Sequence, residues 1–212
     1  MTDASERVLR GFSLAIKFSL ALAIGGAVYE QQWATLFVSA VTLLLVFLLP
    51  RFLERSYHIA LPIEFEFAIA LFIYASLFLG EVSGYYTRFW WWDLVLHAGA
   101  GLGFALVGFL LVYGLYSGGR VQAKPGLIAL LAFSFSTALG ALWEIFEFSG
   151  DHLFGTNMQK SGLVDTMWDL IVNVAGALLV SLAGLQYIRR GKAGMVERFI
   201  RAFVVKNPLR FR

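Results

Sequence analysis

The stretch that decides the fold is residues 90–116, WWWDLVLHAGAGLGFALVGFLLVYGLY, in which Asp93 is the single charged residue and His97 the single histidine. A helix needs about 20 mainly apolar residues to cross a bilayer. This run exceeds that length and is bounded by Arg88 and Arg120. We therefore predict a membrane-spanning helix over 90–116.

The rest of the chain has the same character. Of its 212 residues 59% are hydrophobic and 15% are charged, with a mean hydropathy of +0.73, whereas soluble domains are about 45–50% apolar and about 25% charged. Apolar runs bounded by charged or turn residues predict six helices, at 9–29, 33–49, 61–79, 90–116, 126–148 and 164–188. The prediction is an all-α polytopic membrane protein with a single six-helix domain over 1–190. Zero cysteines exclude disulfides and thiolate chemistry.

Basic residues are distributed unequally between the loops. With a cytoplasmic N-terminus, fourteen of the 17 lysines and arginines fall on the inner side, two (Arg88 and Lys160) fall on the outer side, and Lys17 lies within the first span. Short cytoplasmic loops carry the excess of positive charge. We therefore expect both termini in the cytoplasm and residues 81–89 and 149–163 facing outward. All six tryptophans then form an outer aromatic belt.

The tail over 191–212 is basic and amphipathic. Val196, Phe199, Ile200 and Phe203 follow helical spacing, with arginines between them. This pattern is typical of an interfacial helix on an anionic inner leaflet, and a solvated positive flank is the alternative. Neither interpretation gives the tail chemistry.

Acidic residues have the opposite distribution. The outer half holds Glu30, Glu81, Asp93, Glu144, Glu147, Asp151, Asp165 and Asp169. An ionised carboxylate inside a membrane is costly unless it is paired, hydrated or bound to a metal. Because two outer basic residues cannot neutralise eight acids, we expect the acids inside helices to share protons or to bind a cation.

Three predicted helices carry their polar residues on one face, at spacings of three or four. These residues are Asp93 and His97 on the fourth span, Glu144 and Glu147 on the fifth, and Asp165, Asp169 and Asn173 on the sixth. Small residues continue each face inward and allow close helix packing. We therefore predict that the three faces converge at the outer end of the bundle, with Glu144 and Asp169 within about 5 Å of His97 or joined to it by an ion or water.

Oxygen ligands with one imidazole suit Mg, Mn or Ca, and also Zn or Fe. All seven residues are candidate ligands of a divalent cation. His97, Glu144 and Asp169 are the candidate catalytic residues, as ligands or acid–base groups, because each lies at least a turn inside an apolar run.

Plainer interpretations stay open for single residues. Glu147, Asp151 and Asp165 lie close enough to predicted helix ends to be hydrated. Asp93 can be a first-turn residue favoured by the helix dipole. A lone buried His97 can be a packing residue, but the carboxylate four residues before it favours a functional role.

The fourth and sixth spans also resemble each other. Residues 92–101, WDLVLHAGAG, align without gaps on residues 168–177, WDLIVNVAGA, and residues 81–84, EVSG, resemble residues 147–150, EFSG. We therefore predict a parallel repeat of helix pairs 3–4 and 5–6. In such a repeat Asp93 faces Asp169, and two facing carboxylates either share a proton or hold a cation.

The outer segments carry a family likeness. WEIFE at 143–147, FGTNMQ at 154–159 and DTMWD at 165–169 together resemble the signature of the YjdF-type family of bacterial inner-membrane proteins, and Asp93 with His97 resembles its preceding helix. The same pair is similar to the Asp and His element of VanZ-like membrane proteins. The likeness covers about residues 60–180 and departs in the loop after Gln159 and in the first two spans. It implies the fold and the site without naming a reaction, and the VanZ-like similarity loosely implies a role at the cell envelope.

Three functions are compatible with these residues. The first is a one-sided site that binds a divalent cation or protons and acts on a membrane lipid or a lipid-linked envelope group. The second is an ion or small-solute transporter or channel, which would need polar residues continuing to the inner side. The third is a non-catalytic assembly factor. A nucleic-acid partner is not expected, because membrane topology explains the basic excess.

Overall fold

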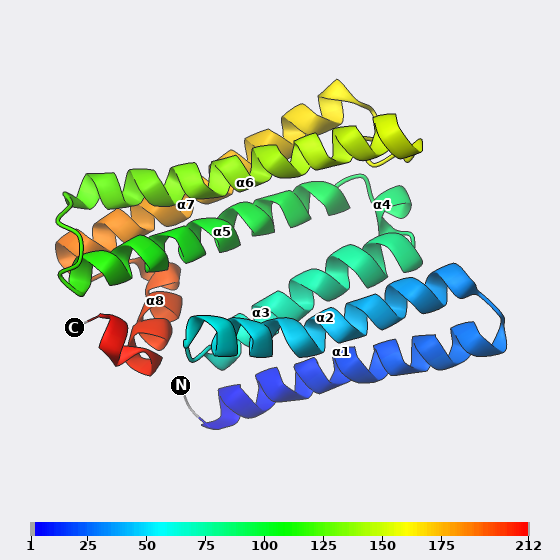
Figure 1. Cartoon of the computed structure of the whole chain (residues 1–212), viewed down its shortest axis with the longest axis horizontal. Coiled ribbons are helices and arrows are strands. Elements are labelled where there is room, and N and C mark those ends of the chain that lie inside the picture. The colour runs from blue at the N-terminus through cyan, green and yellow to red at the C-terminus, as the bar shows by residue number, and fades with distance from the viewer. Residues whose placement is uncertain (1–2, 212) are drawn as a thin grey trace. The chain divides into compact units, whose positions relative to one another are not determined.

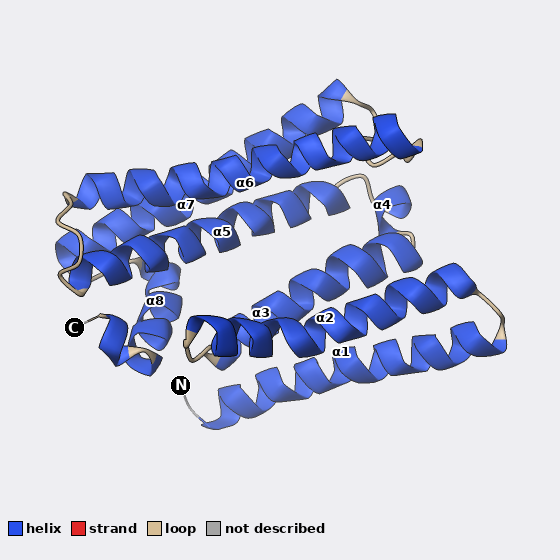
Figure 2. Cartoon of the chain, in the orientation of Figure 1, coloured by secondary structure: helices blue, strands red, loops and turns tan. Residues whose placement is uncertain are grey.

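The structure is a computed structural model that describes residues 3–211, and helices account for nearly all of it (Figures 1 and 2). Among the described residues six helices are long and apolar enough to cross a membrane, which confirms the predicted number of spans. The chain divides into two compact units at the Trp92–Asp93 bond.

The first unit contains α1 (Asp3–Tyr29), α2 (Trp33–Tyr57) and α3 (Ile63–Ile73), and α3 continues as the π-helix η1 (Tyr74–Val82) before the short α4 (Tyr85–Arg88). Helix α1 packs on α2 and α3, and α2 packs on η1. The Lys17 ammonium lies 4.8 Å from the centre of the Phe47 ring. A cation–π contact therefore accommodates this charge inside α1.

The second unit contains α5 (Trp92–Ser117, whose first residue closes the first unit), α6 (Pro125–Phe154), α7 (Leu163–Arg190), α8 (Gly194–Lys206) and the short 3-10 helix η2 (Pro208–Arg210). Pro125 is the first residue of α6, where its missing N–H costs nothing. Gly155 ends α6 in the left-handed conformation, at φ 66°, which favours glycine. Large apolar side chains such as Leu142 and Ile145 are exposed on the outside of α6, as expected of a lipid-facing surface.

Three predicted helix ends were wrong. The prediction over 9–29 began too late, because α1 begins at Asp3. The prediction over 33–49 stopped before Pro50, but α2 continues through that proline to Tyr57, because one missing backbone donor does not end a helix that apolar packing supports. The prediction over 126–148 stopped at the first polar cluster, but α6 continues to Phe154. Its last turns carry Glu147 and Asp151, which are therefore helical residues.

Helices α5 and α7 run in the same direction and touch along their glycines. A Cβ on Gly101 of α5 would overlap the Asn173 carbonyl of α7, a Cβ on Gly176 would lie 2.7 Å from the Ala98 oxygen, and a Cβ on Gly184 would lie 2.5 Å from the Phe109 ring. These contacts advance together along both helices. The predicted repeat requires such parallel packing, while the repeat of whole helix pairs stays a prediction.

Helix α8 forms where the tail pattern predicts a helix, but protein covers part of its apolar face. Ile200 and Phe203 are buried, and Phe203 meets Phe211 edge to face at 6.1 Å. Phe211 in turn lies 5.7 Å from Tyr113 of α5. The apolar residues of α8 thus find partners within the second unit, and contact of the tail with a leaflet stays a prediction.

Candidate functional site

The candidate site is the polar cluster of the second unit, centred on His97. His97 is 7% exposed and lies one turn after Asp93 in α5. Its Nε2 atom is 3.6 Å from Asp93 Oδ1, and its Nδ1 atom is 3.6 Å from Glu144 Oε1 of α6. Both distances are too long for a direct hydrogen bond. The imidazole therefore lies between two carboxylates, each within reach of a shared ion or water.

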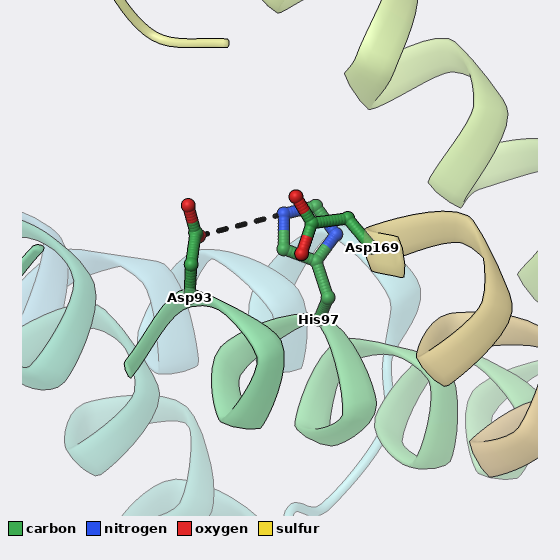
Figure 3. A group of neighbouring side chains, drawn as sticks. All are labelled: Asp93, His97 and Asp169. Carbon is green, nitrogen blue, oxygen red and sulfur yellow. Dashed lines mark ion pairs between the residues drawn. The ribbon is translucent and has the colours of Figure 1, made fainter. Parts of the chain in front are cut away.

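Two groups of side chains meet at this imidazole. In the first group Asp93, His97 and Asp169 each offer a possible metal-ligand atom within 4.8 Å of the others. In the second group His97, Glu144 and Glu147 do the same. Figure 3 shows the first group, with Asp169 reaching from α7 toward the His97 ring beside Asp93. The predicted convergence of Glu144 and Asp169 on His97 is therefore present in the structure.

Several carboxylate oxygens in the cluster have no hydrogen-bond partner. Both side-chain oxygens of Glu144 and Oδ1 of Asp169 are buried without a donor among the described residues. Glu144 is 5% exposed and Asp169 is 1% exposed. A buried, unpartnered carboxylate is costly, so these oxygens suit a ligand that the protein does not itself supply.

Trp143 fixes the fourth carboxylate of the cluster. Glu147 is 7% exposed, and its Oε1 accepts a hydrogen bond of 2.9 Å from the Trp143 indole nitrogen. The sequence analysis placed Trp143 in the aromatic belt and missed this contact. The four-residue spacing of Trp143 and Glu147 on one helix was the available signal.

Lys160 brings a positive charge to the edge of the cluster. Its Nζ atom lies 2.6 Å from Asp93 Oδ2, and the two side chains are 32% and 13% exposed. Sequence reasoning counted Lys160 only as an outer loop charge, because nothing in the spacing of residues 160 and 93 indicates contact. Asp93 is therefore both a first-turn residue of α5 and an ion-paired residue, and its role in the site stays a prediction.

Asp151 organises the loop that carries Lys160. Its Oδ1 accepts hydrogen bonds of 2.7 Å from the Thr156 hydroxyl and the Met158 N–H, and its Oδ2 accepts one of 2.9 Å from the Gln159 N–H. The side-chain amide nitrogen of Gln159, Nε2, donates a hydrogen bond of 2.6 Å to the Thr166 hydroxyl. Asp151 thus has a structural role in the loop between α6 and α7.

The remaining two predicted ligands stand apart from the two groups. Asp165 is half-buried, and neither group contains it. Asn173 is 1% exposed, and neither atom of its side-chain amide has a partner among the described residues. A Cβ on Gly140 would lie 2.6 Å from the Asn173 Oδ1 atom, so this amide faces α6 one turn further along α7 than Asp169.

Close helix packing forms the floor of the site. The Ser136 hydroxyl of α6 donates a hydrogen bond of 2.9 Å to the Gly101 carbonyl of α5. Further inward, Ala105, Ala177 and Val180 form a buried apolar cluster. Beyond the polar cluster, α5 and α7 therefore pack against each other through apolar side chains.

The fold and this cluster define a class: a six-span α-helical membrane protein whose buried carboxylates and histidine could hold a metal ion. The chain belongs to the family described as "Predicted membrane protein (DUF2238)", which matches residues 12–190. A protein of Thermotoga maritima described as "Uncharacterized protein" is 26% identical over 132 residues, which cover 60% of this chain and 65% of that protein. The match thus spans less than two thirds of that relative's length. No solved structure matches the chain.

Proposed function

We propose that the His97 cluster binds a divalent cation. The observation that carries the proposal is the set of buried oxygens of Glu144 and Asp169 that lack donors. The cluster holds four carboxylates, and Lys160 is paired with one of them. A divalent cation would offset this negative charge and satisfy the oxygens. Carboxylates with one imidazole suit Mn, Fe or Zn, with Mg or Ca as the harder alternatives.

We place this site at the outer side of a bacterial inner membrane, with both termini in the cytoplasm. The asymmetry of basic residues supports this orientation. In that orientation the exposed tryptophans Trp90 and Trp168 lie at the outer interface, where such side chains are enriched. Within the matched family, the YjdF-type signature is our finer assignment for this chain.

We further propose that the site acts on a lipid or a lipid-linked envelope group in the outer leaflet. A bound cation would neutralise a phosphate or activate water. His97 and Glu144 would hold the cation, and Asp169 would hold or move a proton beside it. The apolar packing at Ala105, Ala177 and Val180 supports a one-sided site over a transport path, because a path would need polar residues there. An assembly factor, the third alternative, would lose folding and not ion binding when the cluster is changed.

Metal analysis of the purified chain tests the cation. We expect about one divalent ion per chain, lost with a strong chelator and regained with Mn²⁺ or Zn²⁺. Glu144→Gln should lose this ion. Glu81→Gln, which changes an exposed carboxylate outside the cluster, is the matched control and should keep it. A wild type without metal, or equal metal content in both variants, would contradict the proposal.

The substrate class needs its own measurement. Lipids that copurify with the wild type, identified by mass spectrometry, should include a phosphate-bearing species that is depleted in Glu144→Gln. An identical lipid profile in both preparations would argue against a lipid substrate while leaving the cation site intact.

A further inference from the structure

We infer that the two nitrogens of His97 have different roles when the cation is bound: Nδ1 binds it together with Glu144 and Glu147, and the ring shifts so that Nε2–H, whose nitrogen lies 3.6 Å from Asp93 Oδ1 in this structure, donates to Asp93. Lys160 is ion-paired with Asp93 and acts as a positioning residue. This inference rests on the proposed cation site. It specifies which ring nitrogen binds the cation and assigns a role to the loop that carries Lys160.

The chemistry of imidazole requires such a division. A neutral imidazole has one N–H and one lone pair. A metal takes the lone pair, and metal-bound histidines almost always donate the other N–H to a carboxylate or carbonyl, which fixes the orientation of the ring. His97 faces a carboxylate at each nitrogen, so one side can hold the cation and the other can accept the N–H.

Charge selects the side. Lys160 Nζ lies 2.6 Å from Asp93, so a cation on the Nε2 side would compete with a fixed ammonium for the same carboxylate. On the Nδ1 side, Glu144 and Glu147 make no ion pair with lysine or arginine among the described residues. Both carboxylates of the group with Glu144 are therefore uncompensated, whereas in the other group Lys160 compensates Asp93 and leaves only Asp169 without an ion pair.

Hydrogen bonding selects the same side. Both oxygens of Glu144 lack a donor, whereas Asp93 is already bound through Oδ2. Glu147 is oriented by the Trp143 indole, the kind of outer contact that holds a ligating carboxylate in place. Asp169 belongs to the group that contains Asp93, so this inference leaves it outside the ligands of the cation.

The competing arrangement is also well defined. In it Asp93, His97 and Asp169 hold the cation and Glu147 is a bystander. The two arrangements make opposite predictions for the same pair of variants, so one experiment can choose between them.

The first experiment is a titration of purified chain with Zn²⁺ in detergent. We expect Glu147→Gln to lose stoichiometric binding. We expect Asp93→Asn to keep the stoichiometry while its affinity falls about 10- to 100-fold, as for other outer-shell partners of metal-bound histidines, and Asp93→Glu to recover part of that affinity. Loss of stoichiometry in Asp93→Asn with unchanged binding in Glu147→Gln would overturn the inference.

The second experiment reads the wild type alone and does not depend on how the variants fold. Selective ¹⁵N-histidine labelling marks three imidazoles. On addition of Zn²⁺, His97, identified by its absence in His97→Gln, should show a metal-bound Nδ1 and a protonated Nε2. Binding through Nε2 would overturn this inference alone. Absence of any Zn²⁺ or Mn²⁺ binding would overturn the proposed function and this inference with it.

Discussion

The helices α5 and α7 share the tripeptide Trp-Asp-Leu, which begins α5 at Trp92 but follows the first five residues of α7 at Trp168, and its two aspartates have different electrostatic surroundings. Asp93 of α5 is ion-paired with Lys160. Asp169 of α7 is 1% exposed, and its Oδ1 has no partner among the described residues. The shared tripeptide lies in the first turn of α5 but more than one turn inside α7. The difference in charge comes from the loop between α6 and α7, whose Lys160 forms an ion pair with Asp93.

The same comparison continues one and two turns inward. His97 of α5 aligns with Asn173 of α7, and Gly101 aligns with Ala177, which is fully buried. The site thus takes its imidazole from one copy of the motif, and the close helix approach at Gly101 takes its glycine from the same copy. The two segments are therefore alike in sequence pattern and helix direction, but they differ in the side chains that they bring to the site.

The largest expected effect tests whether both motifs begin on the same side of the membrane. The chain has no cysteine, so single cysteines report accessibility without background. Thr87→Cys and Ser161→Cys, both at exposed positions, should react with an impermeant maleimide on intact cells, and Gln122→Cys should react only after permeabilisation. The same labelling pattern at all three positions would overturn the parallel arrangement and the six-span topology together.

A smaller effect tests the aligned glycine. Gly101→Ala gives α5 the residue that α7 has at Ala177, but its Cβ would overlap the Asn173 carbonyl. We expect a loss of about 1–3 kcal/mol of stability or more, measured as heat-induced loss of the monodisperse peak in detergent. Gly99→Ala is the control, because no atom lies within 4 Å of its added Cβ, and it should be neutral or slightly stabilising. Equal losses would mean that the helices do not cross at Gly101.

The smallest effect distinguishes the two aspartates directly, in chelator and with no metal added. Asp169→Asn removes a buried uncompensated charge, so we expect its melting temperature to rise by about 2–4 °C, which corresponds to about 1 kcal/mol. Asp93→Asn removes the partly exposed pair with Lys160, and we expect a decrease of no more than about 1 kcal/mol. Changes of the same sign would show that the two carboxylates have equivalent surroundings.

Much of this arrangement could be predicted from local pattern. Spans follow from long apolar runs, and residues three or four apart share a helix face, so the meeting of His97, Glu144 and Asp169 followed from spacing and small residues alone. A ligand role for Asp165 and Asn173 stays a prediction, because helical spacing fixes a face but not how far along the axis the neighbouring helix brings its own polar residue.

Contacts made by loops could not be predicted in this way. Lys160 reaches Asp93 only because Asp151 binds the backbone of Met158 and Gln159 and fixes the loop path. No periodicity links residues so far apart in sequence. The ends of α2 and α6 were wrong for a related reason: tertiary packing decides whether a helix continues past a proline or a polar residue.

The order of residues along the chain has a consequence for synthesis. Translation delivers α5 and α6 before the loop with Lys160 and before α7. Until α7 and that loop are made, the α5–α6 hairpin carries Asp93, Glu144 and Glu147 without Lys160 and without Asp169. A carboxylate inside an apolar helix is costly without a partner, so we expect this hairpin to be the stage of synthesis most sensitive to proteolysis and the arrival of α7 to stabilise it.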